Sequence, residues 1–400
     1  MAYIHRLLEQ SLQHTIQRGK SVLLLGARQT GKTTLIENQL KPDLFISFAD
    51  FDTRIRYERN PALLIQEVDA AKKLLNSERP FLVVVDEVQK IPMIMDVVQH
   101  MIDKKKAQFI LTGSSARKLK RDSDVNLLPG RVVMLQLDAL CLDELPESMC
   151  DLNKLLIYGS LPEIFLQDSD ENKEIDLKSY VKIYLEEEIR TEALVRNLGS
   201  FSKFLEYAAL EVGKPINFSN LSQEVGITRN TICDYYEILE NCLIADRIEP
   251  ITNSTTRRRL SKAPKYLFYD MGVKRLCANL GIQLPEKIMG ELFEQFIGLE
   301  LLRWSRLHND KYVLRYWQDH GGAEIDYVLD VHHRYLPIEV KWSTQPDLRD
   351  ARHLSKFLNE YDCFEQAYIV CRTPRRFMID SKIMAIPWQE MPKILKEVLV

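Results

Sequence analysis

Short apolar runs and longer helix-compatible segments alternate along the first 140 residues. The runs include SVLLL at 21–25, LVVV at 82–85 and FIL at 109–111. Continuous apolar runs of this length are typical of parallel strands buried on both faces. Their alternation with helical segments predicts a right-handed α/β sandwich whose site lies at the carboxyl ends of the strands.

The pattern changes after this region. Residues 138–212 read as helical, with apolar positions at 177, 181, 185 and 189 forming one stripe. The stretch from 216 to 244 then predicts a short helix, a turn at Gly226 and a second helix capped by Thr228. This spacing is that of a helix-turn-helix, and the residues after it predict a wing.

Residues 321–343, GGAEIDYVLDVHHRYLPIEVKWS, predict two alternating strands joined by a short polar turn. Strict alternation places Glu324 and Asp326 on one face, and Ile325 and Tyr327 on the other. On the second strand it places Glu339 and Lys341 on one face. The residues at 338, 340 and 342 then face a core.

Length and composition limit the classes of protein. Four hundred residues predict two to four domains, and we place them at 1–137, 138–212, 213–270 and 271–400. A net charge of −3 excludes a chain that coats nucleic acid along its whole surface, so any such contact requires local patches. The seven cysteines form no C-x-x-C pair, which predicts free thiols in a reducing compartment. Without an apolar leader or an 18-residue apolar run, a soluble cytoplasmic protein with no membrane contact is expected.

The segment LLLGARQTGKTTLI carries the most specific motif. Gly26 and the triplet from Gly31 through Lys32 to Thr33 match G-x-x-x-x-G-K-[ST] between a strand and a helix. The glycines let backbone N–H groups surround a β-phosphate at the positive end of the helix. Lys32 is expected to neutralise β and γ oxygens, and Thr33 to bind Mg²⁺. Thr34 follows in the same loop and is grouped with the nucleotide-binding residues.

Polar residues also end the next two predicted strands. Asp86 closes LVVVD and is expected to hold Mg²⁺ through water, while Glu87 is the candidate general base. Thr112 and Ser114 end the strand in AQFILTGSS and are placed to sense the γ-phosphate. ATP and Mg²⁺ are therefore the expected cofactors.

Two arginines have two interpretations each. Arg131, in LPGRVVMLQL, is either an arginine finger that reaches the γ-phosphate of a neighbouring subunit or a surface arginine. Arg28, inside the phosphate loop, points either at a phosphate or at a neighbour. A finger acting in trans implies a homo-oligomer, for example a hexameric ring.

The ordered motifs LLLGARQTGKTTLI, VVVDEVQKIP, FILTGSSARKL and LPGRVVMLQL resemble the prokaryotic AAA+ ATPases that carry a C-terminal domain of unknown function. The resemblance continues through YGSLPEIF and YLFYDMGV to GELFEQFIGLEL and the 321–343 strands, and so covers nearly the whole chain. It implies an ATPase domain, a helical lid and a winged helix. Glu188 departs from this pattern, because the family usually has aspartate there.

Asp326, Glu339 and Lys341 form the D…E-x-K pattern of restriction-endonuclease-like nucleases. Two carboxylates that meet across a strand pair bind a hard divalent ion, and an adjacent lysine orients water or stabilises a transition state. Glu294 lies on a preceding apolar helix and is the candidate third acid and metal ligand. The alternative is an ordinary ion pair on an exposed strand face.

DNA is a candidate partner through the wing and the C-terminal domain. The wing carries basic residues, namely Arg257, Arg258, Arg259, Lys262 and Lys265. The second helix also carries acids that repel phosphate unless they point away. Two functions remain open: an ATPase coupled to a Mg²⁺-dependent nuclease, or a nucleotide-driven assembly switch whose C-terminal domain is an inactive scaffold that binds a partner.

Overall fold

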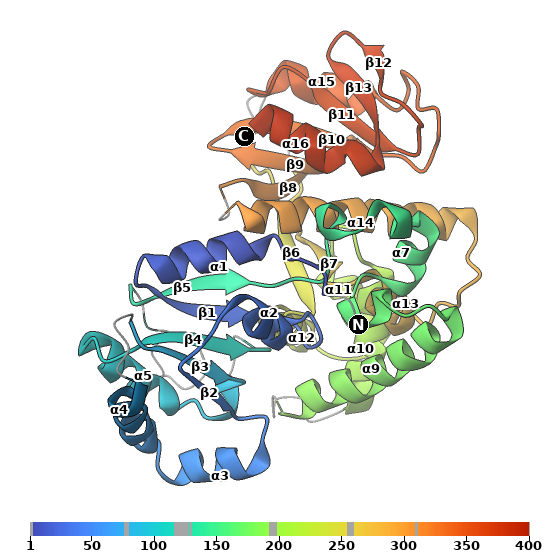
Figure 1. The fold of residues 1–400 in the computed structure, drawn as a ribbon. Coiled ribbons are helices and arrows are strands. Elements are labelled where there is room, and N and C mark those ends of the chain that lie inside the picture. The colour runs from blue at the N-terminus through green and yellow to red at the C-terminus, as the bar shows by residue number, and fades with distance from the viewer. Residues whose placement is uncertain are drawn as a thin grey trace.

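The computed structural model describes residues 3–75, 80–115, 128, 130–191, 198–253, 260–308 and 311–399, without the side chains of 184–191. Figure 1 shows the N-terminal region at the lower left, the middle helices at the right and the C-terminal sheet at the top. The long helix α14 (Glu286–Leu307) runs between the C-terminal sheet and the other two regions.

The N-terminal region is built on one parallel sheet in the order β2-β3-β4-β1-β5. Its strands are β1 (Ser21–Leu25), β2 (Leu44–Ser47), β3 (Leu82–Asp86), β4 (Gln108–Gly113) and β5 (Val132–Gln136). The parallel sheet expected from the apolar runs is confirmed. Because all five strands run the same way, their carboxyl ends share one edge.

Helices cover both faces of this sheet. On β1, Val22 and Leu24 pack in the cluster with α1 and α2, whereas Leu23 and Leu25 pack in the cluster with α4 and α5. This two-sided burial explains why the strand sequence is apolar throughout. The helices are α1 (Leu8–Gln17), α2 (Lys32–Gln39), α3 (Phe51–Arg59), α4 (Leu63–Leu75), η1 (Val88–Lys90) and α5 (Ile94–Asp103).

The middle region is largely helical, as expected. Its elements are η2 (Leu142–Glu144), η3 (Glu147–Met149), α7 (Leu152–Tyr158), α8 (Pro162–Phe165), α9 (Asp170–Thr191), α10 (Leu198–Leu210), α11 (Phe218–Val225), α12 (Arg229–Asn241), β6 (Ala245–Pro250), β7 (Lys265–Phe268) and α13 (Met271–Cys277). Phe201 and Phe204 of α10 meet Tyr235 and Tyr236 of α12 edge to face. One apolar cluster therefore crosses the expected boundary between lid and winged helix.

The turn between α11 and α12 follows the sequence closely. Gly226 ends α11 in the left-handed region, with φ 82°, where a side chain would be strained. Thr228 caps α12, because its hydroxyl accepts a hydrogen bond from the Thr231 N–H at 3.2 Å. The antiparallel pair β6–β7 follows. Residues 257–259, the basic centre of the expected wing, lie outside the described residues.

The C-terminal sheet has eight strands in the order β12-β13-β11-β10-β9-β8-β6-β7. Its elements beyond α14 are β8 (Val313–Gln318), β9 (Glu324–Val331), β10 (Arg334–Val340), α15 (Arg352–Glu360), β11 (Ala367–Cys371), β12 (Phe377–Asp380), β13 (Ile383–Pro387), η4 (Trp388–Glu390) and α16 (Met391–Leu399). Because β6 pairs in parallel with β8, the two strands of the middle region extend this sheet. The middle and C-terminal regions are therefore joined through hydrogen-bonded backbone.

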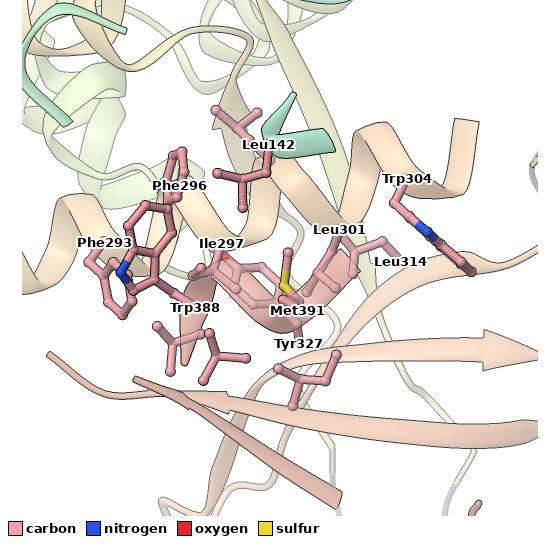
Figure 2. Close-up of a cluster of buried hydrophobic side chains, with 14 of the residues drawn as sticks. Leu142, Phe293, Phe296, Ile297, Leu301, Trp304, Leu314, Tyr327, Trp388 and Met391 are labelled. Carbon is pink, nitrogen blue, oxygen red and sulfur yellow. The ribbon is translucent and has the colours of Figure 1, made fainter. Parts of the chain in front are cut away.

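An apolar core lies between α14, α16 and one face of the C-terminal sheet. Figure 2 shows Phe296 and Ile297 of α14 near Trp388, Met391 and Tyr327. Leu142, from the middle region, reaches the same cluster. The helix α14 is thus buried between the middle region and the C-terminal sheet.

The strands predicted within 321–343 are β9 and β10. His332 and His333 form their turn with φ of 53° and 70°, the positive values that a two-residue hairpin turn requires. Alternation on β9 is interrupted, however. Ile325 packs on the α15 side with Trp317 and Phe357, whereas Tyr327 packs on the α14 side. The prediction that Ile325 and Tyr327 share a face is therefore wrong.

A β-bulge causes this difference. Between the pairs Arg315–Val328 and Trp317–Ile325, β8 advances two residues while β9 advances three. An extra residue on one strand reverses the side-chain direction beyond it, and sequence alternation does not reveal where it is inserted. Asp326 lies inside this bulge.

Two expectations drawn from composition can be compared with the structure. All seven cysteines are free thiols, as predicted. Over the residues that the structure describes, no helix combines the length and apolar composition needed to cross a bilayer.

Candidate functional site

The phosphate loop joins β1 to α2. A Cβ on Gly26 would lie 2.4 Å from the Leu137 carbonyl oxygen, so the close approach of the residue after β5 requires glycine. Gly31 has φ 93° and ends the loop directly before the first turn of α2. The loop therefore presents its backbone to the positive end of a helix, as an anion site requires.

Lys32 closes this loop on itself. Its ammonium group donates to the carbonyl oxygens of Gly26 at 2.8 Å and Ala27 at 3.0 Å, and the residue is 6% exposed. A buried ammonium group needs such acceptors. An anionic ligand in the loop offers it stronger ones.

Asp86, at the end of β3, contacts residues at the ends of β2 and β4 and a residue of the phosphate loop. One carboxylate oxygen accepts from Thr112 Oγ1 at 2.6 Å and lies 3.5 Å from Thr33 Oγ1. The other oxygen accepts from Ser47 Oγ at 2.9 Å. The structure thus brings Thr33, Asp86 and Thr112 together as the sequence predicted, and adds Ser47 from β2. A polar residue that ends a strand was the available signal for Ser47.

Glu87 adopts an uncommon backbone conformation, with φ 58°. Its N–H donates to Thr112 Oγ1 at 3.1 Å, and its carboxylate accepts from Gln89 Nε2. Gln89 Nε2 also donates to Ser114 Oγ at 3.0 Å. Gln89, which sequence reasoning missed, therefore ties the candidate base to the candidate sensor Ser114.

A cavity of ≈ 420 Å³ opens beside the loop and includes Thr34. It is lined by Tyr3, Ile4, Arg6, Gln29, Gly31, Thr34, Asn38, Leu140, Pro162, Glu163 and Leu166. The lining residues come from the N-terminal segment, the loop and the start of the middle region. Its size falls within the range of small-molecule sites.

Arg6 holds these three segments together. Its guanidinium donates to the carbonyl oxygens of Thr30 and Asp138, each at 2.8 Å, and lies 3.1 Å from Glu144. At 7% exposed it is nearly buried. Sequence motifs gave no indication of this role, because Arg6 has no fixed spacing from the loop.

The two arginines with open interpretations lie in different places. Arg131 precedes β5, at the edge of the sheet opposite the phosphate loop, and forms an ion pair with Asp103 at 2.7 Å. Within one chain it is therefore remote from the loop. Arg28 lines a neighbouring cavity of ≈ 350 Å³, and its carbonyl oxygen accepts from Tyr180 Oη at 3.0 Å.

The second candidate site lies where β9 and β10 meet. Their register pairs Tyr327 with Ile338, so Asp326 and Glu339 are the next residues on the two strands. At this point an Asp326 carboxylate oxygen accepts from the Val340 N–H at 2.8 Å. Lys341 Nζ donates to Glu339 Oε1 at 2.6 Å. The three residues of the predicted pattern are therefore neighbours.

Glu339 is buried without full compensation. It is 6% exposed, and its Oε2 has no hydrogen-bond partner among the described residues. Burial and the nearby Asp326 raise the pKa of Glu339 to about 8. Burial also raises the pKa of Asp326, although Lys341 and Lys265 oppose this effect.

Glu294 and Lys265 form the other side of this cluster. Lys265 Nζ donates to Glu324 Oε1 at 2.6 Å and lies 3.9 Å from Glu294 Oε1. Lys265 is 1% exposed, so its assignment to a solvent-facing basic wing is wrong. The cause is the pairing of β6 with β8, which carries β7 into the C-terminal sheet.

The three acids expected to bind one metal ion do not come together in that way. In the described part of the chain, no three His, Cys, Asp or Glu side chains form a group that could hold a metal ion. Glu294 Oε1 lies 3.9 Å from Lys265 Nζ, while burial and the nearby Asp326 raise the pKa of Glu294 to about 8. The pair of Asp326 and Glu339 remains.

The helix α14 connects the two sites. Arg303 bonds to Glu300 at 2.9 Å and to the carbonyl oxygen of Leu140 at 2.9 Å. Glu300 accepts from the Leu142 N–H at 2.7 Å, and Leu140 lines the cavity beside the phosphate loop. The same helix carries Glu294 about two turns earlier.

Comparison with protein-family models divides the chain into three parts. Residues 18–145 match the model described as AAA domain. Residues 149–284 and 289–391 match two domains of unknown function, DUF8612 and DUF4143.

Three similar proteins match this chain over most of its length. The uncharacterized proteins Rv2008c of Mycobacterium tuberculosis and Mb2031c of Mycobacterium bovis are each 24% identical over 384 residues, covering 94% of this chain and 82% of theirs. The uncharacterized protein MJ1637 of Methanocaldococcus jannaschii is 22% identical over 376 residues, covering 80% of this chain and 75% of its own.

Solved structures are more distant. Cdc6p from Pyrobaculum aerophilum has a TM-score of 0.26 and 14% identity, covering 73% of this chain and 96% of that one. Pif1 helicase from Candida albicans has a TM-score of 0.25 and 11% identity, covering 45% and 48%. These scores are too low to assign a fold or a function.

The AAA-domain match is the informative comparison. It contains both the loop that follows β1 and the aspartate that ends β3. The N-terminal region is therefore similar to an AAA domain over the residues that carry both features.

Proposed function

We propose that the chain binds and hydrolyses Mg²⁺–ATP at the phosphate loop and uses this activity to act on nucleic acid. The carrying observation is the convergence of strand-end hydroxyls on Asp86, directly beside Thr33. A bound Mg²⁺ would neutralise phosphate charge there. Thr33 and Asp86 supply the hard oxygen atoms that this ion prefers.

The other residues have distinct roles in this proposal. Lys32 leaves the carbonyl oxygens of Gly26 and Ala27 to bind phosphate oxygens. Glu87 leaves Gln89 to accept a proton from the attacking water. Thr112 and Ser114 relay the state of the site through their bonds to Asp86 and Gln89.

The adjacent cavity is proposed to hold the base. Leu140, Pro162 and Leu166 offer apolar surface for a flat ring, while Asn38 and Glu163 offer polar groups at its edge. Because the cavity is lined by two regions, base binding would hold the N-terminal segment against the middle helices.

Calorimetric titration of Mg²⁺–ATP into the full chain tests the nucleotide site. Wild-type protein should release or absorb heat with a one-to-one stoichiometry. In a separate measurement of ATP hydrolysis, Asp86→Asn should abolish activity. The control Asp96→Asn, an exposed change on α5, should hydrolyse ATP normally. The absence of any heat with the wild type would overturn the proposal.

The C-terminal domain is proposed to be a restriction-endonuclease-like nuclease that requires a divalent cation. The supporting observation is the unpartnered, buried Glu339 Oε2 beside Asp326, with Lys341 adjacent. These two acids fit one hard cation, and Lys341 is placed to stabilise a phosphate. When bound, the ion would supply water of lowered pKa.

A cleavage assay separates this nuclease from an inactive scaffold. Full-length protein is incubated with single- and double-stranded DNA, with and without Mg²⁺ and ATP. The nuclease proposal expects Mg²⁺-dependent cutting that Asp326→Asn abolishes while ATP hydrolysis persists. If the variant cuts as well as the parent, or the parent never cuts, the scaffold interpretation replaces it.

DNA contact by the middle region is a separate proposal. Its basic centre, Arg257–Arg259, lies outside the described residues. On α12, Glu240 accepts from Tyr266 Oη at 2.9 Å and so is directed toward β7 rather than outward. This removes one of the acids expected to repel a phosphate backbone.

A further inference from the structure

Lys265 lies in the C-terminal carboxylate cluster although it belongs to the strand pair of the middle region. It is 1% exposed, and its ammonium group lies 4.7 Å from the centre of the Tyr316 ring. A lysine so deeply buried requires charged or aromatic partners. Burial alone would lower its pKa, but the carboxylates of Glu294 and Glu324 outweigh that effect and raise it.

The four acids of the cluster differ in which lysine they contact directly. Glu324 and Glu294 face Lys265 at 2.6 and 3.9 Å. Glu339 and Asp326 form the other pair, with Lys341 donating to Glu339 at 2.6 Å. Each pair combines one acid of β9, Glu324 or Asp326, with one acid of another element, Glu294 on α14 or Glu339 on β10.

The second pair has an unmet need for a cation. Glu339 Oε2 has no hydrogen-bond partner in the described part of the chain, although the residue is more than nine-tenths buried. The first pair already has an ammonium group within contact distance. Consistent with this division, the described residues contain no three-acid group that could hold a metal ion.

We propose that Lys265 is a built-in cation that neutralises Glu294 and Glu324, so that the cluster takes one divalent cation, held by Asp326 and Glu339, and not two. This rests on the proposed metal site of the C-terminal domain. It assigns Glu294 to Lys265 rather than to the metal. It also makes the site dependent on the middle region, because β7 supplies the lysine.

Direct ligation by Glu294 would require a different arrangement. Its carboxylate would have to leave Lys265, and the buried ammonium group would lose one of its anionic neighbours. Breaking a buried charge pair on one side is strongly unfavourable. Lys265 is therefore a positioning residue, and the number of bound metal ions is the readout that a merely structural role would not change.

Manganese binding to the full-length protein, followed by the EPR signal of free Mn²⁺, tests the assignment. The measurements use an Asp86→Asn background without nucleotide, so that the N-terminal site does not contribute. One Mn²⁺ per chain is expected. Glu339→Gln should weaken its binding ~100-fold or more, whereas Glu294→Gln and Glu324→Gln should change it by no more than about threefold. An equal loss for Glu294→Gln would overturn the inference.

Changing the lysine itself gives the sharper result. Lys265→Met frees two carboxylates and should raise the stoichiometry from one Mn²⁺ to two, while Lys265→Arg should keep it at one. Lys262→Met, an exposed change in the same segment, serves as the matched control. A folded Lys265→Met protein that still binds a single Mn²⁺ would contradict the proposal. If this variant does not fold, the glutamine variants decide.

The same titrations separate this inference from the nuclease proposal. If the parent binds no Mn²⁺ but Lys265→Met binds one, the proposed metal site of the parent fails, and the role of Lys265 as a substitute cation is supported. If neither protein binds Mn²⁺, both proposals fail. Binding of two ions by the parent would contradict the inference alone.

Discussion

The nucleotide site and the C-terminal cluster satisfy their charges in opposite ways. At the nucleotide site, Asp86 accepts hydrogen bonds on both carboxylate oxygens and Lys32 is bonded to loop carbonyls. In the cluster, Glu339 is buried with one oxygen unpartnered among the described residues. The first site is thus organised by hydroxyls and backbone before a ligand arrives. In the second site, burial of an ionised carboxylate is unfavourable, and binding of a cation or a proton would remove this unfavourable energy.

The contrast extends to how each site is assembled. The phosphate-binding part of the nucleotide site uses the ends of neighbouring parallel strands and one loop, all within the N-terminal region. The cluster combines α14, β9 and β10 with a lysine from β7. A site of this second kind depends on how regions pack, so changes far from it should affect it.

The largest expected effect comes from breaking the link between the two sites. Arg303→Met leaves Glu300 buried without its cation and releases the carbonyl of Leu140. We expect the free energy of unfolding to fall by about 3–5 kcal/mol, the cost of an uncompensated buried charge. Chemical denaturation of the full chain measures it. Lys287→Met, exposed on the same helix, should be neutral, and equal stability of the two variants would contradict the link.

Removing the ammonium group of the phosphate loop tests the first site alone. Lys32→Ala should lower the rate of ATP hydrolysis at least ~100-fold, about 3 kcal/mol of transition-state stabilisation. Mn²⁺ binding at the C-terminal cluster should be unchanged, because the two sites bind their ligands with different groups. Steady-state phosphate release provides the rate, with Lys73→Ala as an exposed control. Hydrolysis at the wild-type rate would remove Lys32 from the mechanism.

The charge imbalance of the cluster predicts that the stability of the folded protein depends on pH. The pKa of Glu339 is raised to about 8 by burial and Asp326, above the 4.5 of an ordinary glutamate. The folded state therefore favours the protonated form. That stability is fully present below about pH 4.5 and is lost as the pH rises through 8, by at most about 1.4 kcal/mol per pH unit.

Glu339→Gln removes this titration while keeping the shape of the side chain. Without divalent cations, its melting temperature should rise relative to wild type as the pH increases from 5 to 8. Differential scanning calorimetry at several pH values measures the difference. A difference that is constant over this range would show that Glu339 is ionised in the folded protein at all of them.

The nucleotide site was largely predictable because its requirements are local in sequence. Gly26 is needed where β5 approaches, and Lys32 must follow the loop at a fixed spacing. Both requirements appear as a motif. Ser47 and Gln89 were missed, because polar residues near strand ends are common and neither of these two lies at a motif spacing from the loop.

The cluster was less predictable, for three physical reasons. A bulge in β9 re-aims Asp326 and cannot be located from alternation. The pairing of β6 with β8 buries Lys265, which its sequence neighbours suggested was exposed. Finally, the contacts within a cluster built from four elements are determined by how those elements pack. Glu294 consequently faces a lysine that sequence reasoning placed elsewhere.

The smallest change in stability is expected from replacing Arg131. The same variant tests whether the nucleotide site is complete within one chain. Its partner Asp103 is exposed, and surface pairs of this kind contribute little, so Arg131→Ala should leave the melting temperature unchanged.

Arg131 lies at the amino ends of the strands, whereas the phosphate loop lies at their carboxyl ends, so it can act only on the loop of another copy. If it does, Arg131→Ala should be inactive alone, and mixing it with inactive Lys32→Ala should restore ATP hydrolysis through mixed oligomers. Asp103→Ala, which removes the same surface pair, is the matched control and should hydrolyse ATP normally. Full activity of Arg131→Ala at every protein concentration would show that no arginine finger is supplied from this position. The nucleotide site would then not need Arg131 of a second copy.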